Sequence, residues 1–169
     1  MSSEQGSVYA SFIESQVKAE MERKTNLDER GSRLQQASSL TVGLFVAALG
    51  MLLGKDQRMT EPGLGFFVSS VVFLMLAFLS GVVATRLFKY KVATPVTLMA
   101  MLGEAHWTDT EITSKNNTAW LNVETLQHLR PGNNVKALAL LCGVVAQGIG
   151  VILGIVTFVA VAKAGTILG

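Results

Sequence analysis

A stripe of small and polar residues in the last apolar stretch of the chain has the spacing of a helical seam. It consists of Gly143, Gln147, Gly150, Gly154 and Thr157, which follow one another at intervals of four, three, four and three residues. This alternation keeps the five residues on one face of a helix, as in a left-handed coiled coil. In lipid, small residues let helix backbones approach closely, and the Gln147 amide would prefer a partner across a helix interface or water.

Two interpretations of this stripe are open from the sequence. In the first, the stripe packs its helix against other helices of the chain or against a neighbouring subunit. In the second, Gln147 and Thr157 line a narrow pore at the axis of a homo-oligomer, and the glycines set its width. The second interpretation requires several copies, because three helices do not by themselves surround a conducting pore.

Basic side chains are the candidates for contact with an anionic ligand or with acidic lipid head groups. Three of them follow the second apolar stretch directly, where they also fit a topology signal. The others lie in polar segments, where the simpler interpretation is a solvated helix face. The candidates are Lys18, Arg23, Lys24, Arg30, Arg33, Arg86, Lys89, Lys91, Lys115 and Arg130.

The chain carries no recognisable catalytic or metal-binding constellation. His106 and His128 are isolated, and the single cysteine, Cys142, lies within an apolar stretch where a thiolate is disfavoured. We interpret Trp107 and Trp120 as packing residues rather than a ligand-stacking pair. No nucleophile elbow, zinc-protease motif, P-loop or dinucleotide fingerprint occurs. We therefore expect no enzymatic activity, no metal and no cofactor.

Composition places these residues in a membrane protein. Of the 169 residues, 50% are hydrophobic and only 15% are charged, whereas a soluble domain carries about 25% charged residues. The apolar residues concentrate in three stretches without charge, at 38–54, 64–85 and 137–162. A bilayer core of about 30 Å needs roughly 20 helical residues, and a backbone in lipid must satisfy its own hydrogen bonds. The prediction is an all-α integral membrane protein with three transmembrane helices.

The distribution of Lys and Arg predicts the orientation of these spans. Eleven of the 14 basic residues lie before the first span or between the second and third. Basic residues favour the cytosolic side, so we expect the N-terminus in the cytosol and the C-terminus outside. The remaining segments are then a cytosolic helix at 1–37, an external loop at 55–63, a cytosolic helical segment at 86–136 and an external tail at 163–169.

Helix boundaries in the cytosolic segments are predicted from capping patterns. Ser11-x-x-Glu14 is a candidate capping box, although that helix could begin nearer Ser7. Thr94-Pro95 suits the start of a short helix over 96–106, because proline is favoured at the first helical position. Thr108-x-x-Glu111 is a second capping box, opening a helix to about residue 130. Pro131-Gly132 is predicted to end that helix, with Asn133 or Asn134 capping the helix that becomes the third span.

The layout resembles small bacterial membrane effectors of the SLATT and Pycsar-effector type. Glu20-x-Glu22-Arg23-Lys24 and Arg30-Gly31 precede the first span, and a short loop at 55–64 joins the first two spans. Arg130…Asn133-Asn134-x-Lys136-Ala137 leads into the last span, which is an addition to the two-span pattern of that class. The resemblance implies a cytosolic N-terminal helix running into a close pair of spans. It also implies permeabilisation or depolarisation of the cell membrane when a partner nucleotidyltransferase or cyclase signals infection.

The leading functional prediction is a homo-oligomeric channel or pore-forming effector of the inner (plasma) membrane. Its cytosolic helices would gate it, in antiviral defence, with a nucleotide or oligonucleotide as ligand and a signalling enzyme as partner. The alternative is a non-conducting membrane anchor or assembly subunit whose cytosolic helices dock a partner protein. The expected partners in either case include the lipid bilayer and further copies of the chain.

Overall fold

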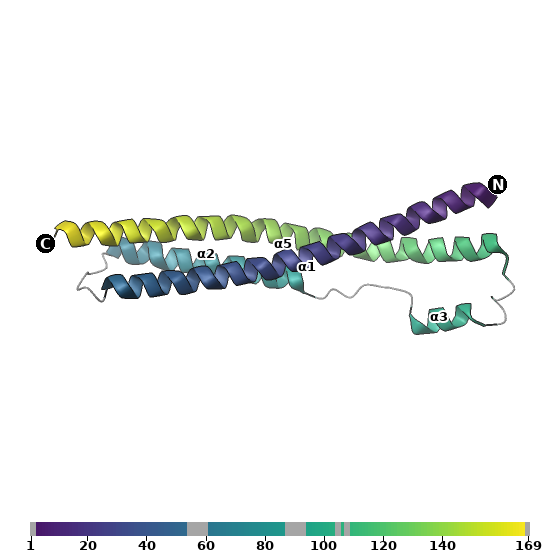
Figure 1. The fold of residues 1–169 in the computed structure, drawn as a ribbon, viewed down its shortest axis with the longest axis horizontal. Coiled ribbons are helices and arrows are strands. Elements are labelled where there is room, and N and C mark those ends of the chain that lie inside the picture. The colour runs from purple at the N-terminus through teal and green to yellow at the C-terminus, as the bar shows by residue number, and fades with distance from the viewer. Residues whose placement is uncertain (1–2, 54–60, 87–93, 104–105, 107–108, 168–169) are drawn as a thin grey trace. The chain divides into compact units, whose positions relative to one another are not determined.

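The computed structural model describes residues 3–53, 61–86, 94–103, 106 and 109–167. Nearly all of these residues are helical, and no strand occurs among them. Helix α1 spans Ser3–Leu53, α2 spans Glu61–Thr85, α3 spans Pro95–Met101 and α5 spans Glu111–Ile167 (Figure 1). Three of them, α1, α2 and α5, are long and apolar enough to cross a membrane. The predicted all-α class, and the prediction of three helices long and apolar enough to cross a membrane, are therefore confirmed.

Two helix starts follow from capping threonines. Thr94 precedes α3, and its hydroxyl accepts a hydrogen bond from the Thr97 amide at 3.1 Å, with Pro95 at the first helical position. This start agrees with the sequence prediction, but α3 ends at Met101 rather than at His106. At the start of α5 the cap is Thr110, whose hydroxyl accepts from the Thr113 amide at 3.3 Å. The predicted box at Thr108 lies outside the described residues.

The predicted cap at Ser11 is wrong, because α1 already begins at Ser3 and Ser11 lies inside it. The Ser11 hydroxyl donates to the carbonyl of Val8 at 2.9 Å. A serine in a helix interior commonly uses a preceding carbonyl in this way instead of capping a terminus.

The predicted helix end at Pro131-Gly132 is also wrong, because α5 continues through Pro131. A proline in a helix interior removes one backbone hydrogen bond and usually costs about 3 kcal/mol. Here the neighbouring residues Leu129, Gly132 and Asn133 are all buried. Their packing keeps the helix continuous, since tertiary contacts override local propensity.

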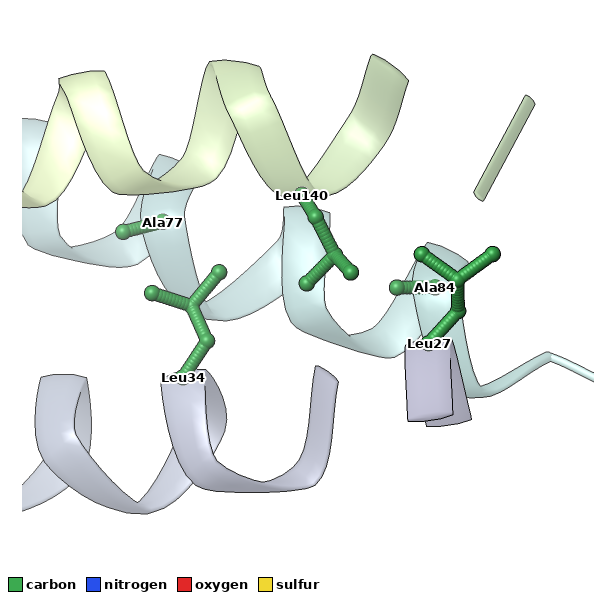
Figure 2. Packing of buried hydrophobic residues seen from close by; sticks show 5 residues of the cluster. All are labelled: Leu27, Leu34, Ala77, Ala84 and Leu140. Atoms are coloured by element: carbon green, nitrogen blue, oxygen red, sulfur yellow. The ribbon is translucent and has the colours of Figure 1, made fainter. Parts of the chain in front are cut away.

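The chain divides into two compact units, and α1 and α5 contribute to both. Unit 1 comprises residues 1–26 and 87–135, and unit 2 comprises residues 27–86 and 136–169. In unit 2, α2 packs with the C-terminal parts of α1 and α5. Figure 2 shows its core, where side chains from all three helices point toward one another. The core residues are Leu27 and Leu34 from α1, Ala77 and Ala84 from α2, and Leu140 from α5.

Candidate functional site

The small and polar stripe of α5 faces the interior of unit 2. Gly143, Gly150, Gly154 and Thr157 are buried, and Gln147 is half-buried. The buried positions continue with the same spacing on both sides, to Lys136 and Leu140 before the stripe and to Val161 after it. We call this continuous buried line, from Lys136 to Val161, the α5 seam.

The glycines of the α5 seam bring α5 close to both neighbouring helices. A Cβ atom added at Gly143 would lie 2.8 Å from the Ser80 Cβ. One added at Gly150 would lie 2.9 Å from the Leu74 Cγ. One added at Gly154 would overlap the ring of Phe45, which itself packs edge-on against Phe158 at a centroid distance of 5.6 Å. Real Cβ atoms do not occupy such positions, so glycine is required for this close approach.

Several buried or half-buried polar groups along these helices are hydrogen-bonded inside unit 2, whereas the buried Ser38 hydroxyl of α1 has no hydrogen-bond partner. The Ser70 hydroxyl donates to the Gly150 carbonyl at 2.6 Å and so joins α2 to α5. The Thr157 hydroxyl donates to the Leu153 carbonyl of its own helix at 2.9 Å. The Gln35 side-chain amide donates to the Thr85 hydroxyl at 3.0 Å and joins α1 to α2. Because buried polar groups must be hydrogen-bonded, these contacts let Ser70 and Thr157 lie in an apolar interior without water.

An ion pair lies at the first position of the α5 seam. The Lys136 side chain is fully buried, and its ammonium group contacts an Asp28 carboxylate oxygen. Asp28 is on α1, and its side chain is 29% exposed. Neither residue was predicted from the sequence as part of a site. The pair could have been predicted because Lys136 continues the spacing of the stripe. A lysine at such a buried position requires a carboxylate at the same height on a neighbouring helix.

Unit 1 holds a second polar contact between α1 and α5. The buried Asn133 side-chain amide donates to both the backbone carbonyl and a carboxylate oxygen of Glu20, each at 2.9 Å. The Glu20 carboxylate also lies 3.5 Å from Arg23 and 3.6 Å from Arg130. Arg130 donates in addition to Gln16 at 3.2 Å, and Arg23 to Asn134 at 3.1 Å. Sequence reasoning missed this network, because it depends on which residues the two helices place side by side.

The predicted anion-binding residues are dispersed rather than gathered into one basic site. Arg23 and Arg130 are brought together, but around the carboxylate of Glu20. Arg33 lies 3.6 Å from Glu29, and Lys18, Arg30 and Arg86 are exposed. Lys24 is half-buried. Lys89 and Lys91 lie outside the described residues.

Lys115 links the start of α5 to α1. Its ammonium group lies 2.6 Å from a Glu111 carboxylate oxygen and 3.5 Å from the Ser7 hydroxyl. The hydrogen bond and charge of Lys115 lower the pKa of the Glu111 carboxyl below its ordinary value of 4.5. Lys115 is therefore used in contacts within the chain.

The remaining candidates are separate from these contacts. His106 Nδ1 lies 3.1 Å from an Asp109 carboxylate oxygen, and His128, Trp120 and Cys142 are exposed. Trp107 lies outside the described residues. Among the residues that the structure describes, no group of three metal-binding side chains comes together.

Comparison with protein-family models, curated proteins and solved structures gives no match for this chain.

Proposed function

We propose that the chain is a membrane-anchored assembly subunit. In this proposal unit 2 crosses the membrane as a three-helix bundle, and unit 1 lies in the cytosol and docks a partner. The asymmetry of basic residues in the sequence supports this orientation. The apolar length of α1, α2 and α5 supports membrane insertion.

One observation favours an anchor over a channel built on the α5 seam. Its glycines and Thr157 are occupied by contacts with α1 and α2 of the same chain or with their own helix. A residue that packs inside one chain does not at the same time line a lumen between chains. Conduction along this stripe would require the unit 2 bundle to separate.

A second candidate function, a channel between copies, is favoured by a different face of α1. Ser39, Gly43, Ala47 and Gly50 are all exposed, and space is open beside Gly43 and Gly50. In lipid, a stripe of small residues lets a helix of another copy approach closely. In that arrangement the exposed Lys18 and Arg30 would be the first candidates for contact with an anionic nucleotide.

Ion flux across liposomes containing the purified full-length chain separates the two functions. The anchor proposal predicts ion flux no greater than in empty liposomes. It also predicts that native mass spectrometry of gently extracted membranes detects a discrete complex of the chain with its partner. Flux above that background would contradict it. If flux also falls in Gly43→Leu and persists in the control Gly148→Leu, the channel between copies is supported. Gly148 is the matched control because it is exposed on α5 and also has open space beside it.

A further inference from the structure

The Ser38 hydroxyl of α1 is a buried polar group without a hydrogen bond. The residue is 1% exposed, and its oxygen has no hydrogen-bond partner. Other hydroxyls inside these helices donate to the carbonyl four residues earlier, as Thr41 does to Ala37 at 2.8 Å. An unpaired buried hydroxyl destabilises a fold. Because Ser38 is closed to water, its partner has to be a neighbouring side chain.

Two contacts fix the register of α1 against α5 on either side of Ser38. In each of them the α5 residue comes 109 positions after its α1 partner. The contacts are Leu34 with Gly143 and Phe45 with Gly154. A constant offset means that the two helices run parallel in this region. The residue opposite Ser38 is therefore Gln147, which follows it by the same 109 positions.

Both residues lie on the faces that the two helices turn toward each other. Ser38 comes one turn after Leu34 on α1, and Gln147 comes one turn after Gly143 on α5. Gln147 is half-buried and makes no hydrogen bond with the other residues that the structure describes. Its amide needs a partner too, since a primary amide without hydrogen bonds is unfavourable in an apolar environment.

Another hydroxyl near this level is that of Ser80 on α2. Its Cβ lies 2.8 Å from a Cβ atom added at Gly143, which is one turn of α5 away from Gln147. The side chains of Ser70 and Gln35 already donate hydrogen bonds to other groups. Gln147 is therefore the polar side chain that matches the level of Ser38, and Ser80 is the natural control.

We propose that the Gln147 side chain has two positions, and that in the second it turns toward α1 and accepts a hydrogen bond from the Ser38 hydroxyl. This structure holds the first position, in which Gln147 is half-buried and the hydroxyl is unpaired. The change requires rotation about side-chain bonds of Gln147 and no movement of a backbone. The second position depends only on the packing of unit 2, so it goes beyond the proposed function and is expected in an anchor and in a channel alike.

The two positions make Gln147 a conformational switch in the apolar part of unit 2. Turned toward Ser38, its amide joins α1 to α5. Turned away, the amide lies at the partly exposed side of α5, where a polar group on a further helix can hydrogen-bond it. The choice between the positions therefore couples the contact of α1 with α5 to the association of unit 2 with another helix.

A double-mutant cycle in detergent tests the proposal on the full chain. Ser38→Ala and Gln147→Met should each raise the unfolding equilibrium constant about threefold, which is the average size of a polar contact between helices in lipid. The double variant should be no less stable than either single variant, because all three lose the same hydrogen bond. Effects that multiply, to about ninefold in the double variant, would overturn the proposal. Unchanged or increased stability in Ser38→Ala would also overturn it, because removing an unpaired hydroxyl relieves its cost.

Two further serines provide matched controls for this cycle. Ser80→Ala should combine independently with Gln147→Met, because its hydroxyl lies one turn away from the amide. Ser39→Ala removes a hydroxyl from the exposed neighbour of Ser38 and should leave the unfolding equilibrium constant unchanged. Coupling of Ser38→Ala to Ser80→Ala instead of to Gln147→Met would overturn the proposal and identify Ser80 as the partner.

NMR of the Gln147 side-chain amide reports its position separately from stability. The resonance is assigned by its disappearance in Gln147→Met. In the second position the amide is shielded from solvent, so its exchange with deuterium should be about threefold faster in Ser38→Ala than in the unmodified chain. Ser80→Ala should leave the exchange rate unchanged. Equal rates in Ser38→Ala and the unmodified chain would overturn the proposal.

Discussion

Lys136 on α5 and Asp28 on α1 form an ion pair in which the lysine side chain is fully buried. Removing a buried charge from water is expensive, and its partner restores only part of that free energy. Replacing such a pair by well-packed apolar residues of similar volume is often neutral for the stability of the fold, or even stabilises it. The clearest physical effect of the pair is on alignment, because a buried ammonium group restricts which part of α1 lies beside it.

Breaking this pair from the carboxylate side should destabilise unit 2. We expect Asp28→Asn to lower the free energy of unfolding by about 3 kcal/mol, near the lower end of the range for breaking a buried ion pair, because Asp28 is 29% exposed. The double variant Asp28→Leu, Lys136→Met should lose much less, since it removes the buried charge of Lys136 together with the carboxylate of Asp28. Thermal unfolding in detergent measures both. Equal losses in the two variants would contradict a buried lysine that depends on Asp28.

The two glycines Gly150 and Gly148 provide a matched test of close packing on α5. A Cβ at Gly150 would lie 2.9 Å from Leu74 and 3.2 Å from the Ser70 carbonyl oxygen, whereas Gly148 has open space. We expect Gly150→Val to destabilise the protein by about 1–3 kcal/mol through overpacking. Gly148→Val should change stability by less than about 0.5 kcal/mol. The opposite order in thermal unfolding would show that the α5 seam does not face α2.

The hydrogen bond from Ser70 to the Gly150 carbonyl should make a smaller contribution. Polar contacts between helices in lipid contribute about 0.6 kcal/mol on average and up to about 1.7 kcal/mol. We expect Ser70→Ala to lose stability within that range, because the donor at 2.6 Å disappears. Ser69→Ala removes a hydroxyl from the exposed neighbouring residue and serves as the control. If the two variants unfold at the same temperature, the hydrogen bond contributes nothing measurable.

The contact between Glu111 and Lys115 should depend on pH. Lys115 lowers the pKa of Glu111 below 4.5, so the folded state favours the charged carboxylate. The stabilising contribution is present above pH 4.5 and is lost as the pH falls through the lowered pKa of the folded state. NMR titration of the Glu111 carboxyl should show this pKa return toward 4.5 in Lys115→Met, and remain lowered in the control Lys18→Met. An unchanged pKa in Lys115→Met would contradict Lys115 as the cause.

Sequence periodicity was sufficient to predict the helices and to place the small residues of the α5 seam on one face, but not to show what that face contacts. The spacing of Gly143, Gly150 and Gly154 places them on one face, and uncharged length identifies the helices that are apolar enough to cross a membrane. Both signals lie within the sequence of a single helix, so neither depends on the neighbouring helix. By contrast, the continuation of α5 through Pro131 depends on the burial of Leu129 and Asn133, which a capping pattern does not contain.

The side-chain contacts between α1 and α5 could not be predicted from the sequence, for a similar physical reason. The contacts of Lys136 with Asp28 and of Asn133 with Glu20 join residues more than 100 positions apart. Nothing local to either residue specifies its partner, because several acidic residues lie at helical spacing along α1. A groove of unit 1 lined by Tyr9 and Ile112, among others, was missed likewise, since each residue alone is compatible with ordinary packing.

The buried ion pair restricts how α1 and α5 can move. Sliding α5 along α1 by seven residues would carry the Lys136 ammonium away from Asp28 to the level of Met21 or Gln35, and would break the contact between these two charges. A piston-like displacement of one long helix past the other therefore requires separating a buried charge pair. Small changes in tilt or in the distance between the helices preserve the pair at one height. Any motion transmitted along these helices should therefore be a rocking or spreading motion rather than a translation.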